Sequence, residues 1–262
     1  MTDAWSPRAA WLRRVASDLK IGLLFSTRLP LPHPASIGGA EVARASWALP
    51  VIGALIGLLG ALVYWLACRF GLPPLLGAGL ALAMTLAVTG CLHEDGLADT
   101  FDGFGGGTDR DRKLEIMRDS RLGTYGACAL ALSLVLRVGA LASLARPVWV
   151  ALALIAAHAG ARAVMPLFLR VVPPARPDGL SAGAGRPPQT GAMVAALLGF
   201  AILLFGLGVA RSAAALLLLL VVLAVMRRLC LQQIGGQTGD VAGALEQISE
   251  IAILLTAVAD RV

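Results

Sequence analysis

Trp47 to Cys68 read WALPVIGALIGLLGALVYWLAC, a stretch without one charged side chain. About twenty apolar residues in a helix cross the hydrocarbon core of a bilayer, so this stretch predicts a membrane-spanning helix. Its many glycine and alanine residues suit helix packing in lipid, because small side chains let neighbouring backbones approach closely. The stretch therefore favours an integral membrane protein over a soluble domain.

The same pattern recurs along the chain. Further apolar runs lie at about 72–92, 124–145, 147–169, 190–210 and 212–226. A last segment, 241–259, has apolar residues at helical spacing but carries Glu246 and Glu250 on another face, which leaves open whether it spans. Only 15% of the residues are charged, against about 25% in a soluble domain. We therefore expect an all-α, polytopic integral membrane protein with about six to seven transmembrane helices, forming one membrane-embedded domain over residues 1–262.

Positive charge is distributed unevenly between the segments that join the apolar runs. If the N-terminus is cytoplasmic, the turns on the far side hold only Arg69, Arg146 and Arg211, and the other loop arginines and lysines lie in the cytoplasm. This bias predicts that segments 93–123 and 170–189 are both cytoplasmic.

The net charge of +6 has two explanations, membrane lipid and nucleic acid. Residues 11–25 resemble an amphipathic helix at the membrane surface, where basic side chains meet anionic lipid. No basic run interleaves with aromatic residues, so we expect membrane lipid as a partner and no nucleic acid.

The candidate chemistry begins in His93 to Gly103, which read HEDGLADTFDG. Asp95, Asp99 and Asp102 follow one another at i, i+4 and i+7, so on a helix they lie within roughly 60° of each other. Three carboxylates on one face repel unless a cation lies between them, and hard oxygen ligands suit Mg²⁺ or Mn²⁺ together with phosphate groups. The sequence therefore predicts a metal and catalytic site here; the alternative is a solvated acidic loop.

Glycines and arginines follow the aspartates within 93–123, which we expect to be a cytoplasmic catalytic loop. The amides of Gly105 and Gly106 can approach an anion closely, although a flexible linker fits these glycines equally well. Arg118 and Arg121 suit phosphate oxygens, or else form ordinary surface ion pairs with neighbouring acids.

Two further regions contribute candidate residues. Gly235 to Asp240 read GGQTGD, a turn that opens a helix. Asp240 is a candidate metal ligand or base; the alternative is an N-terminal cap by Thr238 or Asp240, and the two roles are compatible. Arg162 lies inside an apolar run, where ionisable residues are costly and usually functional, and we expect it near the anion site at the cytoplasmic end.

These motifs resemble those of a known family, the bacterial cobalamin synthases, which are adenosylcobinamide-GDP ribazoletransferases. The resemblance rests on residues 93–103, on 112–126 (RKLEIMRDSRLGTYG), and more weakly on 25–30 (FSTRLP) and the turn at 235–240. Glu94 departs from the family pattern, which commonly has leucine or another residue there, and this weakens Glu94 as a metal ligand.

The resemblance implies an enzyme of the bacterial inner membrane with its active site on the cytoplasmic side. It would join adenosylcobinamide-GDP to α-ribazole, or to α-ribazole 5′-phosphate, and release GMP. For this reaction we expect Mg²⁺ on Asp95, Asp99 and Asp102, one of these or Asp240 as the base, and phosphate contacts from Arg118, Arg121 and Arg162. A homo-oligomer is compatible with the sequence.

Two alternative functions would each require sequence features that differ from those of this chain. A CDP-alcohol phosphotransferase-like phospholipid synthase uses similar carboxylates, but Ala-Arg is expected after its second Asp-Gly, whereas Phe104-Gly105 follows here. A membrane transporter places ionisable groups near the midplane, often within repeats, whereas this chain has no repeat and carries its acidic motif in a cytoplasmic segment.

Overall fold

The structure is a computed structural model that describes residues 7–32, 37–179 and 183–259. Its regular elements are helices, and among the described residues the only β-type pairing is an isolated bridge between Pro174 and Gln237. Six helices are long and apolar enough to cross a membrane, and a seventh span results if one bent pair is counted. The predicted all-α polytopic architecture is therefore confirmed.

The long helices begin and end close to the predicted positions, except that α11 continues eight residues beyond the predicted run 212–226. They are α3 (Leu49–Arg69), α7 (Thr124–Leu144), α8 (Pro147–Val171), α10 (Gln189–Leu207), α11 (Val209–Ile234) and α12 (Gly239–Val258). Proline opens α3 and α8 within the first two positions, where its missing N–H is not needed. The segment 241–259, for which the sequence did not decide whether it spans, forms α12, which is long and apolar enough to cross a membrane.

The segment expected as a loop, 93–123, is largely helical. The preceding helix α4 (Pro74–Thr89) ends at two residues with positive φ, Gly90 at 64° and Cys91 at 59°. The chain then turns by 89° into α5 (Leu92–Gly106), and a short helix α6 (Arg110–Ile116) follows. Two successive residues in the left-handed region explain the bend, because that conformation cannot continue a right-handed helix.

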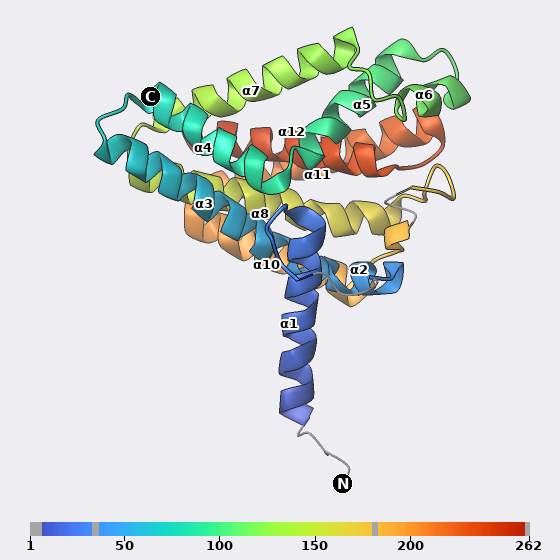
Figure 1. Cartoon of the computed structure of the whole chain (residues 1–262), viewed down its shortest axis with the longest axis horizontal. Coiled ribbons are helices and arrows are strands. Elements are labelled where there is room, and N and C mark those ends of the chain that lie inside the picture. Colours follow the sequence, from blue (N-terminus) through green and yellow to red (C-terminus); the bar gives the residue numbers. More distant parts are fainter. Residues whose placement is uncertain (1–6, 33–36, 180–182, 260–262) are drawn as a thin grey trace.

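The first helix, α1 (Pro7–Ser26), crosses the direction of α3 and α8 and projects from the bundle (Figure 1). Asp18 attaches it, because its carboxylate accepts from Arg44 Nε at 2.8 Å and from Trp47 Nε1 at 2.9 Å. Arg44 belongs to α2 (Gly39–Ala45), and Trp47 to the 3₁₀ turn η1 (Ser46–Ala48). The orientation suits a helix in the membrane plane, and its contact with lipid stays a prediction.

The centre of the bundle is formed by α8 and α12. In both helices 72% of the most apolar stretch is buried. In α11 only 22% of the corresponding stretch is buried, so this helix faces outward. Glycines bring α3 onto α8: a Cβ on Gly53 would lie 2.2 Å from the carbonyl oxygen of His158. This close packing places the polar side chains of α8 and α12 inside the protein.

Candidate active site

The crossing of α5 and α12 brings the predicted acidic residues together. A Cβ added to Gly96 would lie 2.7 Å from the carbonyl oxygen of Asp240, and one added to Gly243 would lie 3.3 Å from the Cα of His93. The two helix backbones are therefore in direct contact at these glycines. Asp95 and Asp99 flank Gly96 in the sequence, so this contact places them beside the N-terminus of α12 and Asp240.

The aspartates form a partly exposed negative patch. Asp95 is exposed and Asp99 partly buried, and the charges of Asp95, Asp240 and Asp102 all act on Asp99. Asp240 lies 3.7 Å from the Arg176 guanidinium. Carboxylate oxygens open to water are the ligands that Mg²⁺ prefers, so the donor set fits a hard divalent cation that also carries phosphate.

Asp102 has a different environment from the other two aspartates of α5. Its side chain is buried, and its oxygens accept the backbone N–H groups of Gly123 at 2.7 Å and Gly126 at 2.8 Å. These are donors at the start of α7, where a carboxylate satisfies free N–H groups and complements the helix dipole. Asp102 therefore joins α5 to α7, and its role as a metal ligand stays a prediction.

The close contact at Gly96 gives the first testable expectation. Gly96→Ala would place a methyl group against the backbone of Asp240, so the helices must separate by some tenths of an ångström. We expect turnover to fall about tenfold or more, because small displacements of positioned groups reduce rates strongly. Gly139→Ala on α7 is the control, since nothing lies within 4 Å of its added Cβ. Equal rates in the two variants would show that this contact does not position the site.

The glycines predicted to hold an anion lie in the last turn of α5. A Cβ on Gly105 would lie 2.6 Å from the Tyr125 ring, so this glycine makes room for an aromatic side chain, while Gly106 is exposed. Their anion-binding role stays a prediction, and the helix replaces the flexible linker that was the alternative.

The two exposed arginines already have acidic partners. Arg118 pairs with Asp178, and Arg121 pairs with Asp119. Hydrogen bonds from the Arg121 side chain and backbone lower the pKa of Asp119 to about 2, so this carboxylate stays ionised at neutral pH. Exposed pairs of this kind contribute little to stability, so a phosphate can displace either carboxylate from its arginine at small cost.

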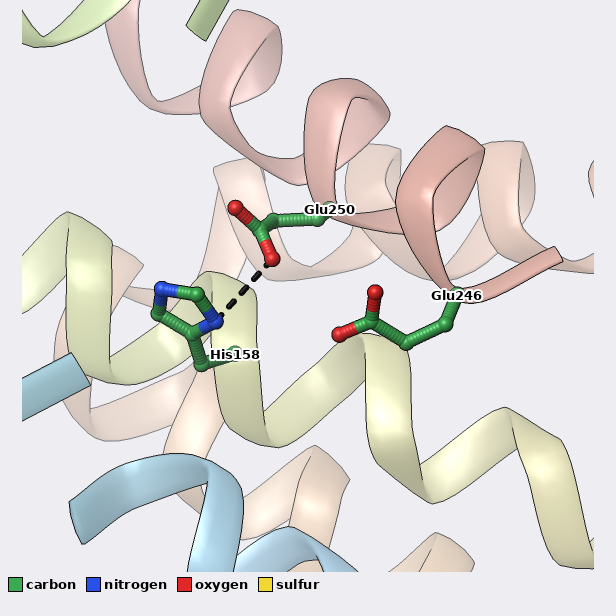
Figure 2. Close-up of side chains that lie close together, drawn as sticks. All are labelled: His158, Glu246 and Glu250. Atoms are coloured by element: carbon green, nitrogen blue, oxygen red, sulfur yellow. Dashed lines mark ion pairs between the residues drawn. The ribbon is translucent and has the colours of Figure 1, made fainter. Parts of the chain in front are cut away.

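A second polar cluster lies buried between α8 and α12. Figure 2 shows that His158, Glu246 and Glu250 point toward one another, with His158 Nδ1 at 3.0 Å from Glu250. Arg162 Nη1 lies 2.6 Å from Glu246, and Arg137 Nη1 lies 3.3 Å from Glu250. All five side chains are almost fully buried.

This buried cluster is the tightest set of possible metal ligands among the described residues. One atom from each of His158, Glu246 and Glu250 lies within 4.8 Å of the others. However, each glutamate already has a guanidinium partner, so a divalent ion would enter beside two fixed positive charges. We interpret the cluster as an ion-paired support for α12, the helix that carries Asp240.

Arg162 belongs to this support in the structure. Its side chain is 1% exposed, and its guanidinium contacts Glu246, His158 and His93. It therefore links α8 to both α5 and α12 just behind the aspartates. The predicted phosphate contact of Arg162 stays a prediction.

Two connections were not assigned from the sequence, although Arg137 was a candidate structural partner for an acidic residue. Glu94, whose residue type departs from the family pattern, pairs with Arg137 at 3.0 Å and so joins α5 to α7. Arg110 donates to the carbonyl oxygens of Ile234 and Ala175, which holds α6 against the GGQTGD turn. An acidic residue in α5 and a lone arginine in an apolar run were the available signals for the first connection.

Comparison with known proteins adds a decisive observation. A family model described as cobalamin-5-phosphate synthase matches residues 18–258. The chain belongs to the cobalamin-5-phosphate synthase family. The matched range extends from the second half of α1 to the end of α12, so it includes the aspartates, the buried cluster and the capping contacts.

Curated members of the cobalamin-5-phosphate synthase family are similar over nearly their whole length. A protein from Bradyrhizobium diazoefficiens is 54% identical over 97% of both chains, and one from Mesorhizobium japonicum is 54% identical over 94% of both. One from Azorhizobium caulinodans is 47% identical over 92% of this chain and 95% of its own. All three are named adenosylcobinamide-GDP ribazoletransferase. No solved structure matches the chain.

Proposed function

We propose that this member of the cobalamin-5-phosphate synthase family transfers the cobinamide phosphate of adenosylcobinamide-GDP to α-ribazole or its 5′-phosphate. GMP leaves, and adenosylcobalamin or its 5′-phosphate forms, which completes the nucleotide loop. The proposal rests on 54% identity over 97% of both chains to a relative named adenosylcobinamide-GDP ribazoletransferase. The matched region includes the crossing of α5 and α12.

The acidic patch suggests how the chain's residues act. The residues that would hold Mg²⁺ are Asp95, Asp99 and Asp240, together with Asp102 where its remaining lone pairs allow. The bound ion would neutralise charge on the diphosphate oxygens. A ribose hydroxyl oxygen of the acceptor attacks the cobinamide-side phosphorus, and the bond between that phosphorus and the GMP oxygen breaks. The hydroxyl proton passes to a carboxylate of the patch.

The cations around the patch suit the leaving nucleotide. Arg118 and Arg121 lie in exposed pairs that a phosphate can replace, and Arg176 lies beside Asp240. Because the basic segments of the chain lie mainly on one side of the predicted spans, we place this patch at the cytoplasmic face of the bacterial inner membrane.

The direct test is GMP release by the full-length protein, purified in detergent or reconstituted in liposomes. With adenosylcobinamide-GDP and α-ribazole, we expect one GMP for each cobalamin formed, with both products absent when divalent cations are chelated. Release of CMP from a CDP-alcohol would support a phospholipid synthase instead. Uptake of the corrinoid into sealed vesicles without bond cleavage would support a transporter, and either result would overturn the proposal.

A further inference from the structure

An apolar cavity adjoins the acidic patch and is not used by the chemistry above. It has a volume of about 110 Å³ and is bounded by α1, α2, α5, α8 and α12, among other segments. Ile21, Phe25, Leu49, Met165 and Leu169 supply much of its wall. Asp95 and Asp240 line the same cavity, so it is continuous with the candidate active site.

The polar groups of the cavity gather on one side. His93 joins Asp95 and Asp240 there, whereas the remaining wall offers little hydrogen bonding. The hydroxyl of Ser46, which also lines the cavity, already donates to the carbonyl oxygen of Ala43 at 2.8 Å. A group that enters past the carboxylates must therefore be apolar, because a buried polar group without a partner costs about 1–3 kcal/mol.

The size and polarity of the cavity discriminate between the parts of the two substrates. A corrin ring with its amide side chains is too large and too polar. Guanine needs several hydrogen-bond partners at its edges, which this wall lacks. The fused-ring base of ribazole is a flat benzimidazole with an apolar outer edge, and its ribose bears the hydroxyl that must reach the carboxylates.

We infer that the cavity binds the benzimidazole base of the ribazole acceptor, with the attached ribose directed to Asp95 and Asp240. This inference rests on the proposed function and assigns one substrate to one part of the site. Because a cavity of about 150 Å³ accepts a benzene ring, this smaller cavity of about 110 Å³ admits only the outer edge of the two-ring base. A second cavity of about 620 Å³ adjoins the first, because Ile21, Phe25 and Val42 line both.

The shared wall gives α1 a role in acceptor binding. Ile21 and Phe25 come from α1, which Asp18 joins to Arg44 and Trp47. The helix that crosses the bundle therefore contributes to the walls of both cavities. Selectivity for the acceptor base would then depend on Phe25 and Met165 rather than on the aspartates.

The test changes the volume of one side chain in both directions. Met165→Phe narrows the cavity and Met165→Ala widens it. We expect Met165→Phe to raise the KM for α-ribazole about tenfold or more and to leave the KM for adenosylcobinamide-GDP within about twofold. Met165→Ala is expected to lower the KM about fivefold for a riboside whose base has a third ring. Met193→Phe and Met193→Ala are the controls, because Met193 is exposed on α10.

The outcomes separate the inference from the proposed function. A wild-type protein that releases no GMP with any acceptor overturns the proposed function. An active wild type whose Met165 variants keep the acceptor KM, or change the KM of both substrates equally, overturns the inference alone. If the Met165 variants change the dependence on lipid chain length instead, the cavity holds an acyl chain and the inference is wrong.

Discussion

Asp99→Asn is expected to reduce GMP release about a thousandfold while the protein stays folded in the membrane. The change keeps the size of the side chain but removes its charge, and Asp99 experiences the charges of three other aspartates. A positioned acid, base or charge commonly contributes about 10²- to 10⁴-fold to a rate. Asp95→Ala is expected to have a comparable effect, since Asp95 lies one helical turn before Asp99 and its charge acts on Asp99.

The measurement is single-turnover GMP release at saturating cation and substrate, with the folded fraction determined by size-exclusion chromatography in detergent. Asp111→Asn is the matched control, because Asp111 is an exposed aspartate on α6 that pairs with Arg110. It should retain nearly full activity. Near-normal rates in both Asp95→Ala and Asp99→Asn would contradict the proposed site.

Glu246→Ala is expected to destabilise the protein by about 3–5 kcal/mol. The substitution leaves the buried guanidinium of Arg162 without its carboxylate, and removal of one partner from a buried pair is strongly unfavourable. It also removes the acceptor for Gln247 Nε2, at 3.1 Å. The effect should exceed that of any exposed charge, because water cannot replace the missing partner.

Thermal or denaturant unfolding of the purified variants checks this expectation. Glu115→Ala is the matched control, because Glu115 pairs with Arg112 on the exposed face of α6, where a pair contributes about 0–1 kcal/mol. If the buried cluster is neutralised by arginines, chelators should not change the stability of the wild type. Equal stability of the two variants, or unfolding by a chelator alone, would show that the cluster is not the support described above.

The sequence predicted the membrane helices well, because their signal is local. Long apolar runs and helix-starting prolines such as Pro147 place the ends of α8 and its neighbours within a few residues of the observed positions. The bend at Gly90 and Cys91 was not predicted, since the apolar run continues through it to Leu92. The helical form of 93–106 was also missed, although the spacing of its aspartates already followed a helix.

The candidate site was predictable only in part, because its geometry depends on contacts between helices. The acidic residues of α5 and the N-terminal cap by Thr238 followed from sequence, and the cap is confirmed. Three contacts between helices could not be derived from the sequence. Gly96 packs on the backbone of Asp240, Asp102 accepts from the start of α7, and Arg162 pairs with Glu246 behind the patch. Local spacing carries no information on which helix will lie opposite.

Binding of Mn²⁺ measured by electron paramagnetic resonance tests the central claim most directly, because it detects the cation without requiring turnover. With adenosylcobinamide-GDP present, the wild-type protein is predicted to bind Mn²⁺ tightly, and Asp99→Asn to bind it at least about tenfold more weakly, with Asp111→Asn unchanged. Equal Mn²⁺ binding by all three proteins would contradict a cation site at the crossing of α5 and α12.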